Sequence, residues 1–235
     1  MTLATTELFI ALLTAHMLAD FVFQTTGMVL NKKRPAALLM HGIHVFVLTA
    51  LFSGGAMWLS LAIAASHIAI DAIKVYFAPD SLRTYLTDQA AHIAILLGVA
   101  LWVPNSALTG LWPLLPPDGI KLSLMISGLI AASMAGGPAV GYLMARYKVA
   151  AQPQGLENAG RIIGLMERGL IYLMILIGEP AGIGFLIAAK SILRFDTVSK
   201  DQKISEYVII GTLASFGWAL AVSLIATSTL FRLGY

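Results

Sequence analysis

Eight ionisable side chains lie within apolar segments of the first hundred residues, and they form four pairs. The pairs are His16 and Asp20, His41 and His44, His67 and Asp71, and Asp88 and His92. The two members of each pair are three or four residues apart, so on a helix both face the same side. Because an ionisable group at the centre of a bilayer costs at least about 2.5–3.5 kcal/mol on insertion scales, eight of them indicate a function.

Imidazole and carboxylate groups gathered in one buried cluster suit Zn²⁺, Fe²⁺ or Mn²⁺. The sequence therefore predicts a site for one or two divalent transition-metal ions, bridged by an aspartate if there are two. Asp71 and Asp88 are also candidates for a catalytic general base. The candidate metal ligands are His16, Asp20, His41, His44, His67, Asp71, Asp88 and His92.

The elements that must position these side chains are predicted to be membrane-spanning helices. The chain has 235 residues, of which 58% are hydrophobic and 11% charged, and its mean hydropathy is +0.84. A soluble domain has about 45–50% hydrophobic and about 25% charged residues, so the composition excludes a soluble globular or disordered chain. The absence of cysteine excludes a disulfide scaffold. We expect an all-α, polytopic transmembrane helix bundle of about eight helices, at residues 5–28, 36–53, 56–77, 84–103, 121–145, 161–178, 181–195 and 206–230.

The distribution of basic residues predicts the orientation of this bundle. If both termini are external, twelve of the 15 Lys and Arg residues fall on the inner side, as the positive-inside rule requires. The order within the pairs agrees with this arrangement. The two inward helices read His before Asp, and the outward helix at 84–103 reads Asp before His, so the pairs share two depths near the inner face.

The sequence divides into two predicted halves, residues 1–103 with the metal site and residues 104–235. The second half has no histidine but carries basic residues near the predicted inner face. Arg168 and Lys190 are deeper than membrane anchoring requires, and with Arg194 they are candidates to bind an anionic group of a substrate. The side chains expected to support the ligands and cations are Gln24, Lys74 and Glu167.

Several segments resemble an uncharacterised family of bacterial inner-membrane proteins, a domain of unknown function. In the first hundred residues they are HMLADFVFQT (16–25), MHGIHVFVLT (40–49), SHIAIDAIK (66–74) and DQAAHIAIL (88–96). The segments GRIIGLMERGLI (160–171), IAAKSILRF (187–195) and SEYVIIGTLASFG (205–217) resemble the second half of its longer members. The resemblance implies a multi-pass protein of the bacterial inner membrane, without a particular activity. A looser likeness, in residue type alone, is to membrane-bound metal-dependent hydrolases.

The sequence favours a metal-dependent intramembrane enzyme, a hydrolase acting on an anionic amphiphile or lipid headgroup at the cytoplasmic leaflet. Three alternatives stay open: a di-iron redox enzyme acting on an acyl chain, a metal or proton transporter, and a structural or accessory membrane subunit. The expected partners are the lipid bilayer and a lipid or amphiphilic substrate. Nucleic acid is not expected, because the basic residues follow the membrane rule. The sequence does not predict the oligomeric state.

Overall fold

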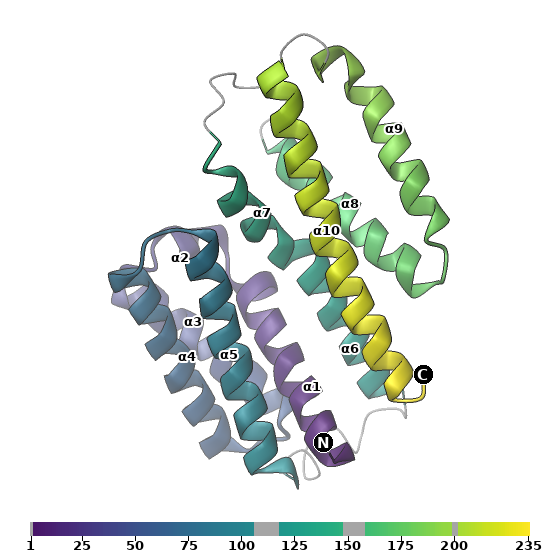
Figure 1. The fold of residues 1–235 in the computed structure, drawn as a ribbon. Helices are drawn as coiled ribbons and strands as arrows, with labels where there is room; N and C mark the ends of the chain where they lie inside the picture. The colour runs from purple at the N-terminus through teal and green to yellow at the C-terminus, as the bar shows by residue number, and fades with distance from the viewer. Residues whose placement is uncertain (1, 106–117, 148–157, 199–201) are drawn as a thin grey trace. The chain divides into compact units, whose positions relative to one another are not determined.

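The computed structural model describes residues 2–105, 118–147, 158–198 and 202–235, with the side chains of 193–198 left out. The described residues form helices and no strand, so the all-α prediction is confirmed (Figure 1). Each of the eight predicted apolar runs coincides with a helix or with consecutive helices. The elements are α1 (Leu3–Met17), the π-helix η1 (Leu18–Phe23), α2 (Thr26–Leu30), α3 (Pro35–Phe52), α4 (Met57–Phe77), α5 (Leu82–Trp102), α6 (Gly119–Ile130), the π-helix η4 (Ala131–Ala135), α7 (Gly136–Met144), α8 (Ala159–Leu176), α9 (Ala181–Val198) and α10 (Gln202–Arg232).

Six helical segments of the described chain are long and apolar enough to cross a membrane. They are Leu3–Phe23, Pro35–Phe52, Met57–Phe77, Leu82–Trp102, Gly119–Met144 and Gln202–Arg232. The protein is therefore a multi-pass membrane protein. The apolar part of α9, Ala181–Ile192, is shorter, and α8 carries three charged residues. Membrane crossing by α8 and α9, and the external position of both termini, stay predictions.

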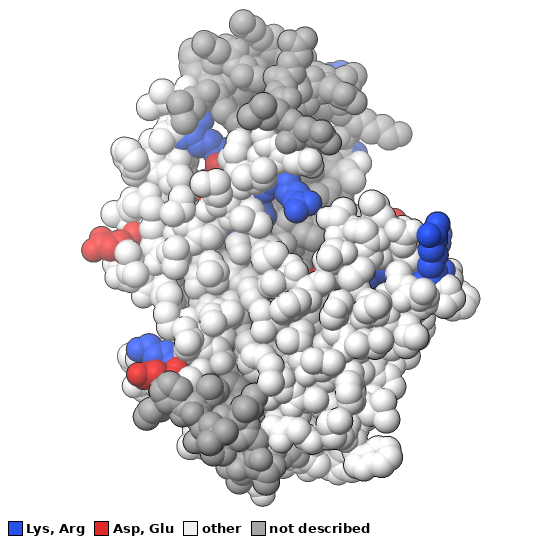
Figure 2. Space-filling view, turned by 180° about the vertical axis from the view of Figure 1, so that it is seen from behind, with Lys and Arg blue, Asp and Glu red and all other residues white. Residues whose placement is uncertain are grey.

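The surface agrees with a lipid environment. Uncharged residues cover most of the described surface on the face shown in Figure 2. Large apolar side chains are exposed on the helices, among them Trp58, near the start of α4, and Trp102, at the end of α5. Because α4 and α5 are neighbouring antiparallel helices, these two rings mark one end of the bundle, as interfacial tryptophans do. Trp112, which we also expect at that interface, lies outside the described residues.

The chain folds as two compact units, Met1–Ser127 and Gly128–Tyr235. In the first unit, α1 packs against α3 and α5, and α4 packs against α3 and α5 (Figure 1). Its core includes Leu8, Leu12, Val45, Ile63 and Leu96. Burial of such side chains between the four helices determines which face of each helix points inward. It therefore also determines which polar side chains point inward.

Close packing of α3 on α4 depends on Gly42. A Cβ atom at this position would overlap the side chain of Ile68, and its distance to Ile68 Cγ1 would be 2.7 Å. A larger residue at this position would therefore require the Ile68 side chain to move. Gly42 follows His41 and Ile68 follows His67, so the same close approach brings these two histidines together.

The first predicted helix, at 5–28, differs from the structure at its end. The α-helix changes to a π-helix at Leu18, and helical structure stops at Phe23. Gln24 is extended, and Thr25 caps the separate helix α2 by accepting a hydrogen bond from the Met28 amide at 3.3 Å. The prediction of one helix continuing to residue 28 is therefore wrong, because a new N-cap competes with the end of the helix.

In the second unit, α8 packs against α10 and η4. Ile171 and Tyr172 of α8 are fully buried, as is Ala219 of α10. Gly128 faces the Tyr172 ring, where a Cβ atom would overlap the phenol. The unit is therefore held by large side chains of α8 that fit against small residues of its neighbours.

Candidate metal centre

Four helical segments of the first unit supply the centre from a similar depth. His41 lies six residues after the start of α3, Asp71 six before the end of α4, and Asp88 six after the start of α5. At the α-helical rise these positions are about 9 Å from the helix ends. Asp20 belongs to η1, close to the same end of the bundle. A π-helix is rare and is frequently found at functional sites, where it changes the direction of a side chain.

The first group of ligand atoms joins α1, α3 and α4. His41 Nε2 lies 3.0 Å from His67 Nε2 and 3.4 Å from both Asp20 Oδ1 and Asp71 Oδ2. His67 Nε2 lies 3.1 Å from Asp20 Oδ1 and 4.0 Å from Asp71 Oδ2. Tetrahedral ligands with bonds of about 2.0–2.1 Å are about 3.3 Å apart. The ligand atoms of His41, His67 and Asp71 lie within 4.8 Å of one another, so these three side chains could hold one small divalent cation.

The second group joins α4 and α5 and also uses Asp71. His92 Nε2 lies 3.9 Å from Asp71 Oδ1 and 3.6 Å from Asp88 Oδ1. The His92 ring stacks on the His67 ring with a centroid distance of 3.9 Å and an interplanar angle of 19°. Asp71 thus directs Oδ2 to the first group and Oδ1 to the second. One carboxylate shared in this way is the arrangement expected for two bridged ions.

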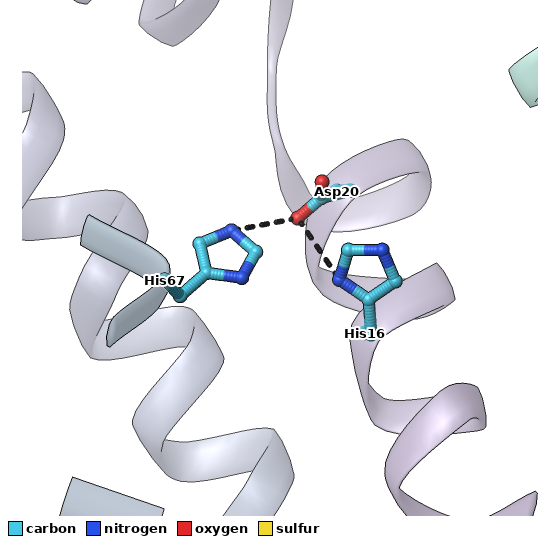
Figure 3. Close-up of side chains that lie close together, drawn as sticks. All are labelled: His16, Asp20 and His67. Carbon is cyan, nitrogen blue, oxygen red and sulfur yellow. Dashed lines mark ion pairs between the residues drawn. The ribbon is translucent and has the colours of Figure 1, made fainter. Parts of the chain in front are cut away.

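The third group extends the first toward α1. Figure 3 shows the Asp20 carboxylate between the two imidazoles of His16 and His67. Asp20 Oδ1 lies 3.8 Å from His16 Nδ1 and 3.1 Å from His67 Nε2. Within the described chain, these three groups are the sets of His, Asp and Glu side chains with ligand atoms close enough to hold an ion.

Unsatisfied polar atoms in the cluster fit a role as metal ligands. All three groups consist of side chains with at most 6% of their area exposed. Among the described residues, several of their buried ligand atoms have no hydrogen-bond partner. These atoms are His16 Nδ1, Asp20 Oδ1, Asp88 Oδ1 and His92 Nε2. A buried polar atom without a partner costs about 1–3 kcal/mol, and a bound ion would satisfy these atoms.

The structure brings together seven of the eight predicted ligands and leaves His44 outside the three groups. The His44 ring lies near the Phe23 ring, at a centroid distance of 6.3 Å. Its Nδ1 atom is buried without a hydrogen-bond partner among the described residues, as is Gln24 Nε2. Neither side chain belongs to a described ligand group.

Two lysines and one glutamine surround the ligand groups. Lys32 Nζ donates to Asp71 Oδ2 at 2.9 Å, and Lys74 Nζ donates to Asp88 Oδ2 at 2.7 Å. Gln89 Nε2 donates to Asp20 Oδ2 and Asp88 Oδ2, both at 3.3 Å, while Gln89 Oε1 lies 3.3 Å from His16 Nε2. Lys74 thus contacts a predicted ligand, and its supporting role stays a prediction.

Sequence reasoning missed Lys32 and Gln89. Lys32 belongs to a basic run, Lys32 to Arg34, which the positive-inside rule alone explains. Gln89 follows Asp88 directly, so helical periodicity places it about 100° away from its neighbour. Gln89 could have been identified as an amide side chain inside an apolar span, because buried amides need hydrogen-bond partners.

The predicted substrate-binding residues belong to the second unit, where Arg168 and Lys190 have hydrogen-bond partners. Arg168 is 4% exposed, and its Nε and Nη2 donate to the Ser133 carbonyl oxygen at 2.9 and 2.7 Å. Its Nη1 donates to Ser215 Oγ at 3.2 Å. Lys190 Nζ donates to Glu167 Oε2 at 2.7 Å. Arg194 lies in α9, and its side chain is outside the described residues.

Comparison with known proteins supports the family resemblance. Residues 8–112 match the model of a family described as a protein of unknown function (DUF3307). The matched segment is similar to that family and contains all eight predicted ligands. No curated protein and no solved structure matches the chain. The family has no assigned activity, so the match lends nothing to the looser likeness to hydrolases.

Proposed function

We propose that the protein is a metal-dependent membrane enzyme with a two-ion centre in its first unit. The observation that carries this proposal is the position of Asp71. Its two carboxylate oxygens face imidazole nitrogens of two separate ligand groups, at 3.4 Å for His41 and 3.9 Å for His92. The buried ligand atoms that lack hydrogen-bond partners among the described residues support the same conclusion.

Hydrolysis is the reaction class that this centre suits best. A divalent ion polarises a phosphoryl or carbonyl oxygen and lowers the pKa of bound water toward about 7. Of the two predicted bases, Asp71 has both oxygens directed at imidazoles, which suits a bridging ligand. Asp88 belongs to one ligand group and offers Oδ1 to it, which leaves Oδ2, paired with Lys74, outside that group. Asp88 is therefore the better candidate to accept the proton of water.

The proposed substrate is an anionic amphiphile whose headgroup bond is cleaved near the bundle end that carries the centre. The depth of about 9 Å below the helix ends fits a headgroup better than the middle of an acyl chain. By the positive-inside rule this end faces the cytoplasmic leaflet of a bacterial inner membrane. Arg168, Lys190 and Arg194 stay predictions for headgroup binding. The hydrogen bonds of Arg168 to Ser133 and Ser215 favour a structural role for this residue.

Transport of a metal ion or proton is the second candidate, and a specific observation favours it. Buried hydroxyl groups continue from the centre toward the opposite end of α3 and α4, at Thr49, Ser53 and Ser60. Ser53 Oγ and Ser60 Oγ lie 3.3 Å apart. A path for ions across the membrane needs such polar groups beyond the ligand site. Uptake of metal into proteoliposomes by the wild type, and not by His67→Ala, would favour transport.

The test of enzymatic function is metal-dependent phosphate release from phosphatidic acid in mixed detergent micelles. Purified protein is loaded with Zn²⁺, Mn²⁺ or Fe²⁺ and compared with His67→Ala and with His44→Ala. His67 belongs to two ligand groups and His44 to none. Both variants replace a histidine with alanine, but only His67→Ala removes a member of the candidate centre. We expect release by the wild type and His44→Ala and its loss in His67→Ala. A folded wild type that binds metal and hydrolyses neither this lipid nor a soluble phosphoester would contradict hydrolysis.

A further inference from the structure

Two ammonium groups touch the candidate metal centre, and both lie at its outer side. Lys32 Nζ and Lys74 Nζ pair with Asp71 and Asp88, the two carboxylates of the second ligand group. The lysine side chains are 14% and 22% exposed, whereas these carboxylates are 1% and 3% exposed. The ammonium groups therefore lie between the buried centre and the surroundings of the bundle.

The two lysines come from the same end of the first unit. Lys32 is in the turn between α2 and α3, and Lys74 is in the last turn of α4. The Tyr76 hydroxyl of α4 donates to the Lys33 carbonyl oxygen at 3.0 Å, which joins this turn to the end of α4. Lys74 Nζ also lies 5.6 Å from the centre of the Tyr85 ring. A molecule approaching the centre from this end meets both cations.

The pairing of Lys32 with Asp71 conflicts with a bound metal ion. Asp71 Oδ2 lies 2.9 Å from Lys32 Nζ and 3.4 Å from His41 Nε2, so the same oxygen would serve both the ammonium and the ion. An ammonium group and a metal ion that share one carboxylate oxygen are two neighbouring positive charges, and they repel each other strongly in a buried site. Lysine has a flexible four-carbon stem, so its ammonium group can turn away without a change in the backbone.

The charge of the filled centre requires an anion. With neutral imidazoles, the three aspartates exceed the two lysines by one negative charge. Two divalent ions add four positive charges, so the surplus becomes positive. Buried charge of one sign is expensive unless a counter-ion pairs with it. Released ammonium groups beside such a centre are donors that suit a phosphate.

We propose that Lys32 and Lys74 bind the phosphate group of the substrate, after bound metal ions have taken over the charge of Asp71 and Asp88. This inference rests on the proposed function and names the residues that select its substrate. In the metal-free protein the two lysines neutralise the carboxylates. In the metal-loaded protein they bind the anion beside the ions, and Gln89 keeps the ligands His16 and Asp20 in place.

The test measures how tightly metal-loaded protein in detergent binds two probes. The probes are inorganic phosphate and phosphatidic acid in micelles. The variants are Lys32→Gln and Lys74→Gln. The matched control is Lys33→Gln, which removes the same charge from the exposed neighbouring residue. Metal affinity of each variant is measured separately, by titration with Zn²⁺ or Mn²⁺. Micelles of phosphatidylcholine, which has no free phosphate monoester, serve as the lipid control.

We expect phosphate affinity to fall about tenfold or more in Lys32→Gln and Lys74→Gln, and to be unchanged in Lys33→Gln. Metal affinity should be unchanged or higher in Lys32→Gln, because a competing cation has been removed. Binding of inorganic phosphate indicates a site for a free anion. Preference for phosphatidic acid over inorganic phosphate indicates a lipid headgroup.

Two results would overturn this inference while the metal site stands. One is wild-type phosphate affinity in both lysine variants of a metal-loaded protein. The other is loss of metal from Lys32→Gln, since the lysine would then support the ligands. A wild-type protein that binds no metal would instead overturn the proposed function, and this inference with it.

Discussion

His41 Nε2 lies 3.0 Å from His67 Nε2, although the two residues are 26 positions apart in the chain and belong to different helices. Both side chains are buried, and Asp20 Oδ1 lies 3.1–3.4 Å from each nitrogen. Two imidazoles and a carboxylate that face one point share either a proton or a cation. In the proposed centre they share a metal ion, and the predictions that follow depend on that ion.

Asp71→Asn should lower the number of bound ions from two to one. The substitution keeps the size of the side chain but removes the charge that lets both oxygens bind cations, at the His41 and His92 sides. Calorimetric titration with Zn²⁺ measures the stoichiometry directly. Asp80→Asn, on the exposed turn between α4 and α5, is the control with the same chemical change. Two ions bound by Asp71→Asn would show that the carboxylate is not a bridge.

Gln89→Leu should weaken metal binding about 10–100-fold, the range for loss of a group that orients a ligand. Gln89 Oε1 can accept a hydrogen bond from His16 only if the proton is on Nε2, which leaves Nδ1 free to face Asp20. The ¹⁵N chemical shifts of His16 report the tautomer, and they should show a mixture in the variant. Gln202→Leu, at an exposed position, is the control. An unchanged His16 tautomer together with unchanged metal affinity would rule out this role.

Metal binding should stabilise the folded protein. An ion that binds only the native state adds about 2.7 kcal/mol when its free concentration is about 100 times the Kd. Thermal unfolding in detergent should therefore shift to higher temperature on addition of Zn²⁺ or Mn²⁺ and return after treatment with a chelator. His67→Ala should show a smaller shift, because it keeps only the group of Asp71, Asp88 and His92, whereas His44→Ala should respond as the wild type does. Equal shifts in the wild type and His67→Ala would indicate non-specific binding.

Arg168→Leu should destabilise the second unit and leave metal stoichiometry unchanged. Arg168 makes three hydrogen bonds, two to the Ser133 carbonyl of η4 and one to Ser215 of α10. Loss of this buried cation leaves those acceptors without their donor, at an expected cost of about 3 kcal/mol. Unfolding in detergent measures the cost, with Arg232→Leu at an exposed position as control. Normal stability with loss of phosphate binding would instead support the sequence-based prediction that Arg168 binds substrate.

The fold was largely predictable from the sequence, because long apolar runs in a membrane protein have few alternatives to helices. The candidate site followed from pair spacing, since His67 with Asp71 and Asp88 with His92 can only face one side of a helix. The break at η1 was not predictable, because Thr25 as an N-cap and Gln24 as a continuing helical residue are equally compatible with the local sequence.

The partners of the ligands were harder to predict than the ligands. Lys32 reaches Asp71 across 39 positions of the chain and Gln89 reaches Asp20 across 69. Such contacts depend on the packing of α3 on α4 and of α1 on α5, and no periodicity within one helix encodes them. The same limit applies to His44, which shares a helix with His41 and yet lies outside the ligand groups.

Metal content of the purified wild-type protein tests the central claim most directly. Plasma mass spectrometry of detergent-purified protein, compared with His67→Ala and Asp88→Ala, gives the identity and number of bound ions. We predict about two equivalents of zinc, iron or manganese in the wild type, and reduced content in both variants, which remove ligands from different groups. Folded wild-type protein without metal, even after reloading, would contradict the proposed metal centre and leave a polar network without an ion.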